Sequence, residues 1–143
     1  MEEESLVNRF DGFSSQNWDK SDVIDFIIKC LDKDETYVYK KGVRGSTQVT
    51  ADLFLPNGCR NLGFLNKSIV EIKRFITRYA LQSIRLVYDY SSGFNEMIVI
   101  SGRYPQTIDF LLKSYLEGKN IRFITIEDLV RIYDRNKERS LTE

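Results

Sequence analysis

Polar residues recur at helical spacing soon after the start of the chain. Asp22, Asp25, Lys29 and Asp32 are separated by three, four and three residues, so they share one face of a helix over 20–33. The other positions of this segment are mostly apolar. The pattern therefore predicts a helix that packs against a core.

Three segments with the composition of strands follow. The ranges 36–41, 48–55 and 68–73 are rich in β-branched and aromatic residues, which favour strands. We expect the glycine-flanked segment around Arg44 to be the loop between the first two. Short connections of this kind predict an antiparallel meander.

The second half of the chain alternates between helical and strand-like patterns. In order, the pattern predicts helix 75–90, strand 97–100, helix 105–116, strand 121–124 and a last helix that begins at the capping-box-like sequence from Thr125. The run 84–88 is also compatible with a strand. The order α-β-β-β-α-β-α-β-α predicts an α/β domain, a mixed β-sheet flanked by helices.

The length of 143 residues suits one domain. We expect a polar leader over 1–19, the domain over 20–135 and a charged tail over 136–143 that frays. Cys30 and Cys59 form no disulfide or zinc pattern, and neither is expected to be reactive. No apolar run approaches the roughly 20 residues of a membrane span. A cytoplasmic protein without membrane contacts is expected.

Histidine is absent, and the 21 basic residues balance the 21 acidic ones. The absence of histidine excludes Ser-His-Asp and Cys-His catalysis and zinc sites that use histidine. Net neutrality argues against a generic polyelectrolyte binder but allows a local basic site. Catalysis would have to use carboxylates, lysines, tyrosines or a metal held by oxygen atoms.

Charged residues interrupt two of the predicted strands. Asp52 lies in the second strand, and Glu71 and Lys73 lie two residues apart in the third, so the latter two share a face with Ile69. If the strands pair as a hairpin, Asp52 and Glu71 lie about 5 Å apart. Two carboxylates so close repel, and a hard cation such as Mg²⁺ removes the conflict. The carbonyl of Ile72 would add a ligand.

These residues carry a resemblance to a known family. Asp52 followed by Glu71-Ile72-Lys73 resembles the PD-(D/E)XK nuclease motif, most closely that of Mrr-type restriction endonuclease domains. Similarity in the right order extends over about residues 20–135, although Ala51 stands where the family has proline. The resemblance implies a restriction-endonuclease-like fold, Mg²⁺ with Mn²⁺ as a substitute, and hydrolysis of DNA phosphodiester bonds in restriction or anti-phage defence.

The resemblance also implies roles for single residues. Asp52 and Glu71 would hold the metal with the Ile72 carbonyl, and Lys73 would assist the attacking water or stabilise the transition state. Asp25 is the candidate for an acidic residue on the first helix, with Asp22 in reserve. The DNA, expected to be double-stranded, would be held by basic and polar residues before and after the site: Lys40, Lys41, Arg44, Ser46 and Arg74.

Other interpretations stay open. The same residues would serve a Holliday-junction-resolvase-like nuclease, with the loop 44–46 holding branched DNA. The resemblance implies a homodimer, or a nuclease module within a larger defence assembly. A catalytically inactive nuclease fold would instead act as a binding or assembly module. A flavodoxin-like or TIR-like domain is the third alternative, although no glycine-rich phosphate loop supports it. Most of the eight tyrosines fall at core spacing, so base stacking is not expected.

Overall fold

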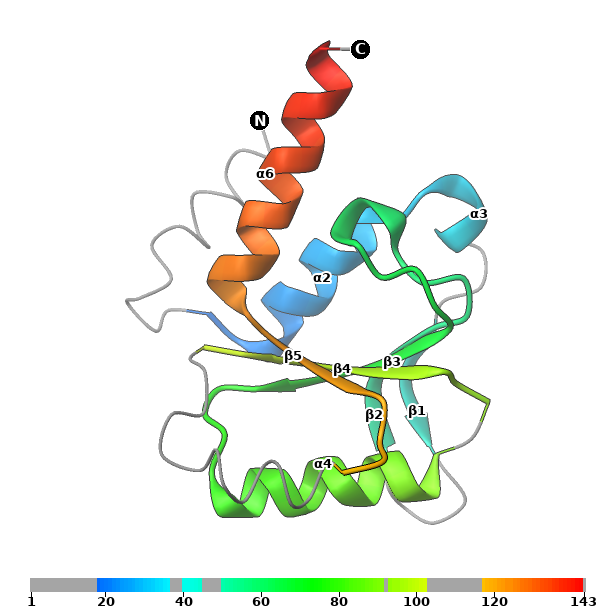
Figure 1. Ribbon diagram of the computed structural model, residues 1–143, viewed down its shortest axis with the longest axis vertical. Coiled ribbons are helices and arrows are strands. Elements are labelled where there is room, and N and C mark those ends of the chain that lie inside the picture. The colour runs from blue at the N-terminus through cyan, green and yellow to red at the C-terminus, as the bar shows by residue number, and fades with distance from the viewer. Residues whose placement is uncertain (1–17, 37–39, 45–49, 92, 103–116, 143) are drawn as a thin grey trace.

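A computed structural model of the chain describes residues 18–36, 40–44, 50–91, 93–102 and 117–142, and the architecture is α/β (Figure 1). Five strands form one mixed sheet in the order β1-β2-β3-β4-β5. Their bounds are β1 (Lys40–Arg44), β2 (Thr50–Leu55), β3 (Ser68–Lys73), β4 (Glu96–Ser101) and β5 (Ile121–Thr125). The predicted class, a mixed sheet with flanking helices, is confirmed.

The sheet has an antiparallel half and a parallel half. β1 pairs with β2 and β2 with β3 in antiparallel orientation, whereas β3, β4 and β5 run parallel. The meander and the parallel second half are therefore as predicted. A flavodoxin-like sheet would be parallel throughout and would reverse its strand order at the ligand site. The sequential order and the antiparallel pairs exclude that alternative.

Helices cover both faces of the sheet. α4 (Arg78–Tyr90) lies against one face, and α2 (Lys20–Cys30) and α6 (Ile126–Thr142) lie on the other side (Figure 1). Shorter elements are α3 (Lys33–Thr36) and the 3-10 turn η2 (Arg60–Leu62). No helix in the described ranges is long and apolar enough to cross a membrane.

Alternation along β3 divides the core between these two layers. Val70 and Ile72 pack into the larger cluster with α2 and α6, and Ile69 packs into the smaller cluster with α4. This is the predicted division, and it follows because successive strand residues point to opposite faces. Glu71 and Lys73 thus belong, with Ile69, to the face that α4 covers.

The two helices that share one face of the sheet, α2 and α6, both begin at a capping box. Asp19 accepts a hydrogen bond from the backbone N–H of Asp22, whose side chain accepts the N–H of Asp19 in return. Thr125 and Asp128 make the same reciprocal pair at the start of α6, as predicted. Such caps satisfy backbone donors that the helix itself leaves free.

Several predicted boundaries were wrong. The first strand begins at Lys40 rather than residue 36, and it includes Gly42 and Arg44, which we assigned to a loop. Trp18 belongs to the core rather than to a leader. α6 continues to Thr142 instead of ending near residue 135. The leader residues 1–17 and the predicted helix 105–116 lie outside the described residues.

Candidate functional site

Asp52 and Glu71 meet where β2 and β3 stop pairing as a regular ladder. The register runs from Leu55 opposite Ser68 to Leu53 opposite Val70, and the next step brings Asp52 to Glu71. At this step, carboxylate oxygens accept the hydrogen bonds of backbone N–H groups in place of the carbonyl oxygens of the ladder. Asp52 Oδ2 accepts the N–H of Ile72 at 2.8 Å, and Glu71 Oε1 accepts the N–H of Asp52 at 3.1 Å. Each carboxylate is thereby held by the backbone of the opposite strand.

The alternation of β2 is interrupted at the same place. Leu53 and Leu55 pack into the cluster beneath α2 and α6, whereas Ala51 packs into the cluster beneath α4. In a regular strand, residues two apart share a face. Asp52 therefore lies where β2 passes from one core cluster to the other, while the register of β2 with β1 is the same on both sides of it.

Glu71 is a buried carboxylate, with only 2% of its surface exposed. Burial, and next the nearby charge of Asp52, raise its pKa from 4.5 to about 7, against opposing effects of Lys73, the Asp52 N–H and Lys20. Removing the carboxylate from water disfavours its charged form, and a second negative charge adds to that. Near neutral pH this group therefore lies close to its titration midpoint.

Lys73 lies beside Glu71 on the same face of β3. Its Nζ is 3.5 Å from Glu71 Oε2 and donates a hydrogen bond to Ser83 Oγ of α4 at 3.3 Å. The lysine is thus held between the acidic pair and the helix that covers this face. An ammonium group in this position can orient a water molecule or interact with a phosphate.

Lys20 is a site residue that the sequence analysis missed. From the first turn of α2, its Nζ lies 2.9 Å from Asp52 Oδ1. The start of α2 is fixed against the end of β3, because Arg74 donates a hydrogen bond to the carbonyl of Trp18 and its guanidinium lies 5.4 Å from the Trp18 ring centroid. No local sequence pattern predicts this contact, because Lys20 and Asp52 are 32 positions apart in the sequence.

Asp25 does not join the acidic pair, contrary to our expectation. It is exposed on α2, where Lys20 is the side chain that reaches Asp52. Across the ranges that the structure describes, no three Asp, Glu, Cys or His side chains are grouped so that they could hold a metal ion. Asp22, the reserve candidate, is the partner of the N-cap residue Asp19 in the capping box of α2.

The expected DNA-binding residues fall into three groups. Lys40, Lys41 and Arg44 lie on β1, the neighbour of β2, where Lys41 is opposite Leu53. Arg74 follows β3 directly but already binds Trp18. Ser46 lies outside the described residues. β1 therefore carries its basic residues beside the strand that holds Asp52, and the Arg44 position is strand rather than loop.

Asp52 and Glu71 supply the oxygen ligands that a hard divalent cation needs. The pair offers four carboxylate oxygens, and magnesium is commonly held by one or two carboxylates together with waters and substrate phosphate. Asp52 Oδ1 already contacts one cation, the Lys20 ammonium, whose side chain is half exposed and can move aside. The sequence predicted the Ile72 carbonyl as a further ligand, but the Ile72 group that contacts Asp52 is its N–H. The other three carboxylate oxygens also have partners: Asp52 Oδ2 and Glu71 Oε1 accept backbone N–H groups, and Glu71 Oε2 lies 3.5 Å from Lys73 Nζ. The two carboxylates are of the ligand type that magnesium prefers, and a cation would have to replace Lys20 at Asp52.

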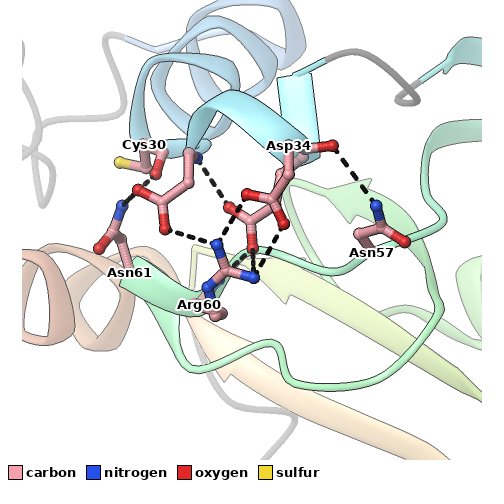
Figure 2. A network of polar contacts seen from close by, with 7 residues as sticks. Cys30, Asp34, Asn57, Arg60 and Asn61 are labelled. Carbon is pink, nitrogen blue, oxygen red and sulfur yellow. Dashed lines mark hydrogen bonds and ion pairs between the residues drawn. The ribbon is translucent and has the colours of Figure 1, made fainter.

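A second polar network ties the loop after β2 to the end of α2 (Figure 2). Arg60 pairs with Asp34 at 2.7 Å and with Asp32 at 3.0 Å. Glu35, which is fully buried, accepts the backbone N–H groups of Asp32 and Arg60. The arginine contacts neutralise these acidic groups, so the network is structural in character.

The thiol of Cys59 lies in the same loop and is inert. Cys59 is fully buried, and burial raises the pKa of its thiol to about 12, with a smaller contribution from Glu35. A thiol that stays protonated is a poor nucleophile. The expectation that Cys59 is not reactive is consistent with this environment.

Comparison of the chain with protein-family models, with curated proteins and with solved structures gave no match.

Proposed function

We propose that this chain is a metal-dependent endonuclease that hydrolyses DNA phosphodiester bonds and has a restriction-endonuclease-like fold. The observation that carries the proposal is the pairing of Asp52 with Glu71 across two diverging strands, with Lys73 beside Glu71. The PD-(D/E)XK resemblance of the sequence supports the same assignment. A role in restriction or anti-phage defence rests on that resemblance alone.

Each residue has a distinct part in this proposal. Asp52 and Glu71 would hold the divalent cation, which supplies, when bound, a water of lowered pKa and neutralisation of phosphate charge. Lys73 would orient the attacking water or stabilise the charge that develops on the phosphate. The backbone N–H groups of Asp52 and Ile72 hold both carboxylates in fixed positions, which limits the reorganisation that the reaction requires.

The test is cleavage of supercoiled plasmid in Mg²⁺ or Mn²⁺. The variants Asp52→Asn, Glu71→Gln and Lys73→Met keep the size of each side chain, and Asp25→Asn is the matched carboxylate control. We expect metal-dependent nicking by the wild type, retained in the control and reduced at least about 100-fold in the other three. Circular dichroism melting would verify that each variant is folded.

Two results would contradict the proposal. One is a wild type that cuts neither plasmid nor linear DNA at high enzyme concentration in either metal. The other is cleavage that survives all three substitutions, which would point to a contaminating nuclease or another site. Loss of cleavage in Asp25→Asn would show that Asp25 is needed for catalysis, as the sequence predicted.

An inactive nuclease fold that serves as an interaction module is the second candidate. The contact that favours it is the 2.9 Å ion pair between Lys20 and Asp52, because the ammonium group of the same chain already supplies the positive charge that a metal would bring to Asp52. Titration calorimetry with Mn²⁺ separates the two. Binding that Glu71→Gln weakens supports the enzyme, and absence of binding supports the module.

A further inference from the structure

Exposed aromatic and aliphatic side chains gather along the outer face of α4 and just before it. Tyr79, Leu86 and Tyr90 are spaced by seven and four residues, which places them on one helix face, and all three are exposed. Tyr79 is 83% exposed and Phe75, in the connection from β3, is 48% exposed. Burial of apolar surface is favourable, so exposed apolar side chains aligned on one helix face indicate a binding surface.

This stripe begins at the candidate site. Ser83 lies four residues after Tyr79, one turn or about 6 Å further along the helix. Its hydroxyl is the group that accepts the hydrogen bond from Lys73. Tyr79 therefore occupies the turn of α4 that precedes the contact with Lys73, and Phe75 follows Lys73 by two residues.

Positive charge exceeds negative charge around the stripe, although Lys73 and Arg85 have acidic partners in Glu71 and Asp89. From Lys73 to Tyr88 the sequence contains four basic residues, Lys73, Arg74, Arg78 and Arg85, and no acidic residue. Asp89, the first acidic residue after them, pairs with Arg85 and Lys119. In a chain whose total charge is zero, this is a local cationic surface.

We infer that this surface binds DNA with unpaired bases, Tyr79 and Phe75 stacking on exposed base faces while the adjacent cations face the phosphates. Stacking needs a π-face that a duplex keeps hidden between neighbouring pairs, and every unpaired base presents one. A second copy of this chain is a poorer occupant. A two-fold contact would bring the same cationic surface of both copies together.

The inference rests on the proposed function and makes its substrate more specific. The scissile phosphate would lie beside unpaired bases, such as those of a flap, of a frayed end or of the segments that negative supercoiling opens in plasmid DNA. It also departs from the expectation that the tyrosines do not stack on bases, because Tyr79 is 83% exposed.

The experiment measures binding of the full chain to a fluorescein-labelled 20-nucleotide single strand and to the duplex of the same sequence, by anisotropy in EDTA so that nothing is cut. We expect tighter binding of the single strand. Tyr79→Ala and Phe75→Ala should each weaken it at least about fivefold, with little effect on the duplex. Tyr79→Trp should retain binding.

Leu65→Ala is the matched control, because Leu65 is 75% exposed but precedes β3 at the end away from Lys73. Unchanged single-strand affinity in both aromatic variants would overturn the inference. So would a loss of self-association on sedimentation in Tyr79→Ala without a loss of DNA binding, which would assign the stripe to a protein contact. The binding assay contains no metal, so its result does not depend on cleavage. Aromatic-dependent binding in EDTA, together with no cleavage in the separate Mg²⁺ and Mn²⁺ assay, would remove the nuclease proposal and leave this surface standing.

Discussion

Replacing Glu71 by glutamine provides a direct measure of what the buried acidic pair costs the fold. The pKa of Glu71 rises from 4.5 to about 7, chiefly through burial. Between these two values the folded state holds a proton that the unfolded chain releases, so stability falls as pH rises. Each pH unit of this interval is worth about 1.4 kcal/mol, which gives a loss of about 3 kcal/mol by pH 8.

Glu71→Gln removes the titrating group but keeps an oxygen that can accept the N–H of Asp52. The free energy of unfolding would be measured by urea denaturation from pH 4 to pH 8.5 in EDTA. Subtracting the wild-type value from that of the variant cancels the other titrating groups. We expect this difference to favour the variant increasingly as pH rises, by about 3 kcal/mol in total.

Addition of Mg²⁺ at pH 8 should reduce the difference, because a cation bound by Glu71 and Asp52 stabilises the charged wild-type site and not the amide. Glu127→Gln, at a side chain that is 60% exposed, measures the effect of the amide itself. A difference that stays constant from pH 4 to pH 8.5 would refute the reasoning. Glu71 would then ionise as readily in the folded protein as in the unfolded chain.

Three further predictions concern other contacts. Lys20→Met removes the ammonium that contacts Asp52 Oδ1 and should tighten Mn²⁺ binding several-fold in calorimetry; weaker binding would show that Lys20 assists the metal. Glu35→Ala leaves two partly buried backbone N–H groups without their acceptor and should cost about 2 kcal/mol in urea denaturation, whereas the exposed Asp34→Ala should cost less; equal losses would contradict this. Gly58→Ala should destabilise the protein by more than about 2 kcal/mol, because Gly58 has φ +69° and its Cβ would lie 2.1 Å from the carbonyl oxygen of Phe64. Gly63 has φ +75° but open space around the position of a Cβ, so Gly63→Ala should cost about 1 kcal/mol. A larger loss of stability in Gly63→Ala than in Gly58→Ala, measured by thermal melts, would contradict this.

Much of the sheet was predictable because its signals are local. β3 matches the predicted range 68–73, and the separation of Glu71 from Val70 and Ile72 follows from strand alternation alone. The proximity of Asp52 and Glu71 was predicted on the condition that the two strands pair, and the antiparallel register from Leu55 opposite Ser68 to Leu53 opposite Val70 meets that condition.

The first strand shows where local signals fail. Tyrosine and valine favour β structure, so the prediction began the strand at residue 36, yet Thr36 ends α3. Lys40–Arg44 becomes the strand because it pairs with β2, from Lys40 opposite Phe54 to Arg44 opposite Thr50. Hydrogen bonds to a neighbouring strand offset the poor propensity of Gly42, and no local window contains that neighbour.

The sequence by itself determined the α/β class, the order of most elements and the two strands that bring Asp52, Glu71 and Lys73 together, because these depend on periodicity and on neighbouring segments. Only the tertiary structure decided that Lys20, and not Asp25, reaches Asp52, that Glu71 is buried enough to raise its pKa, and that Tyr79 faces outward beside Lys73. These properties arise from the docking of α2 and α4 on the sheet. Burial and the distances between distant side chains exist only once those helices are in place.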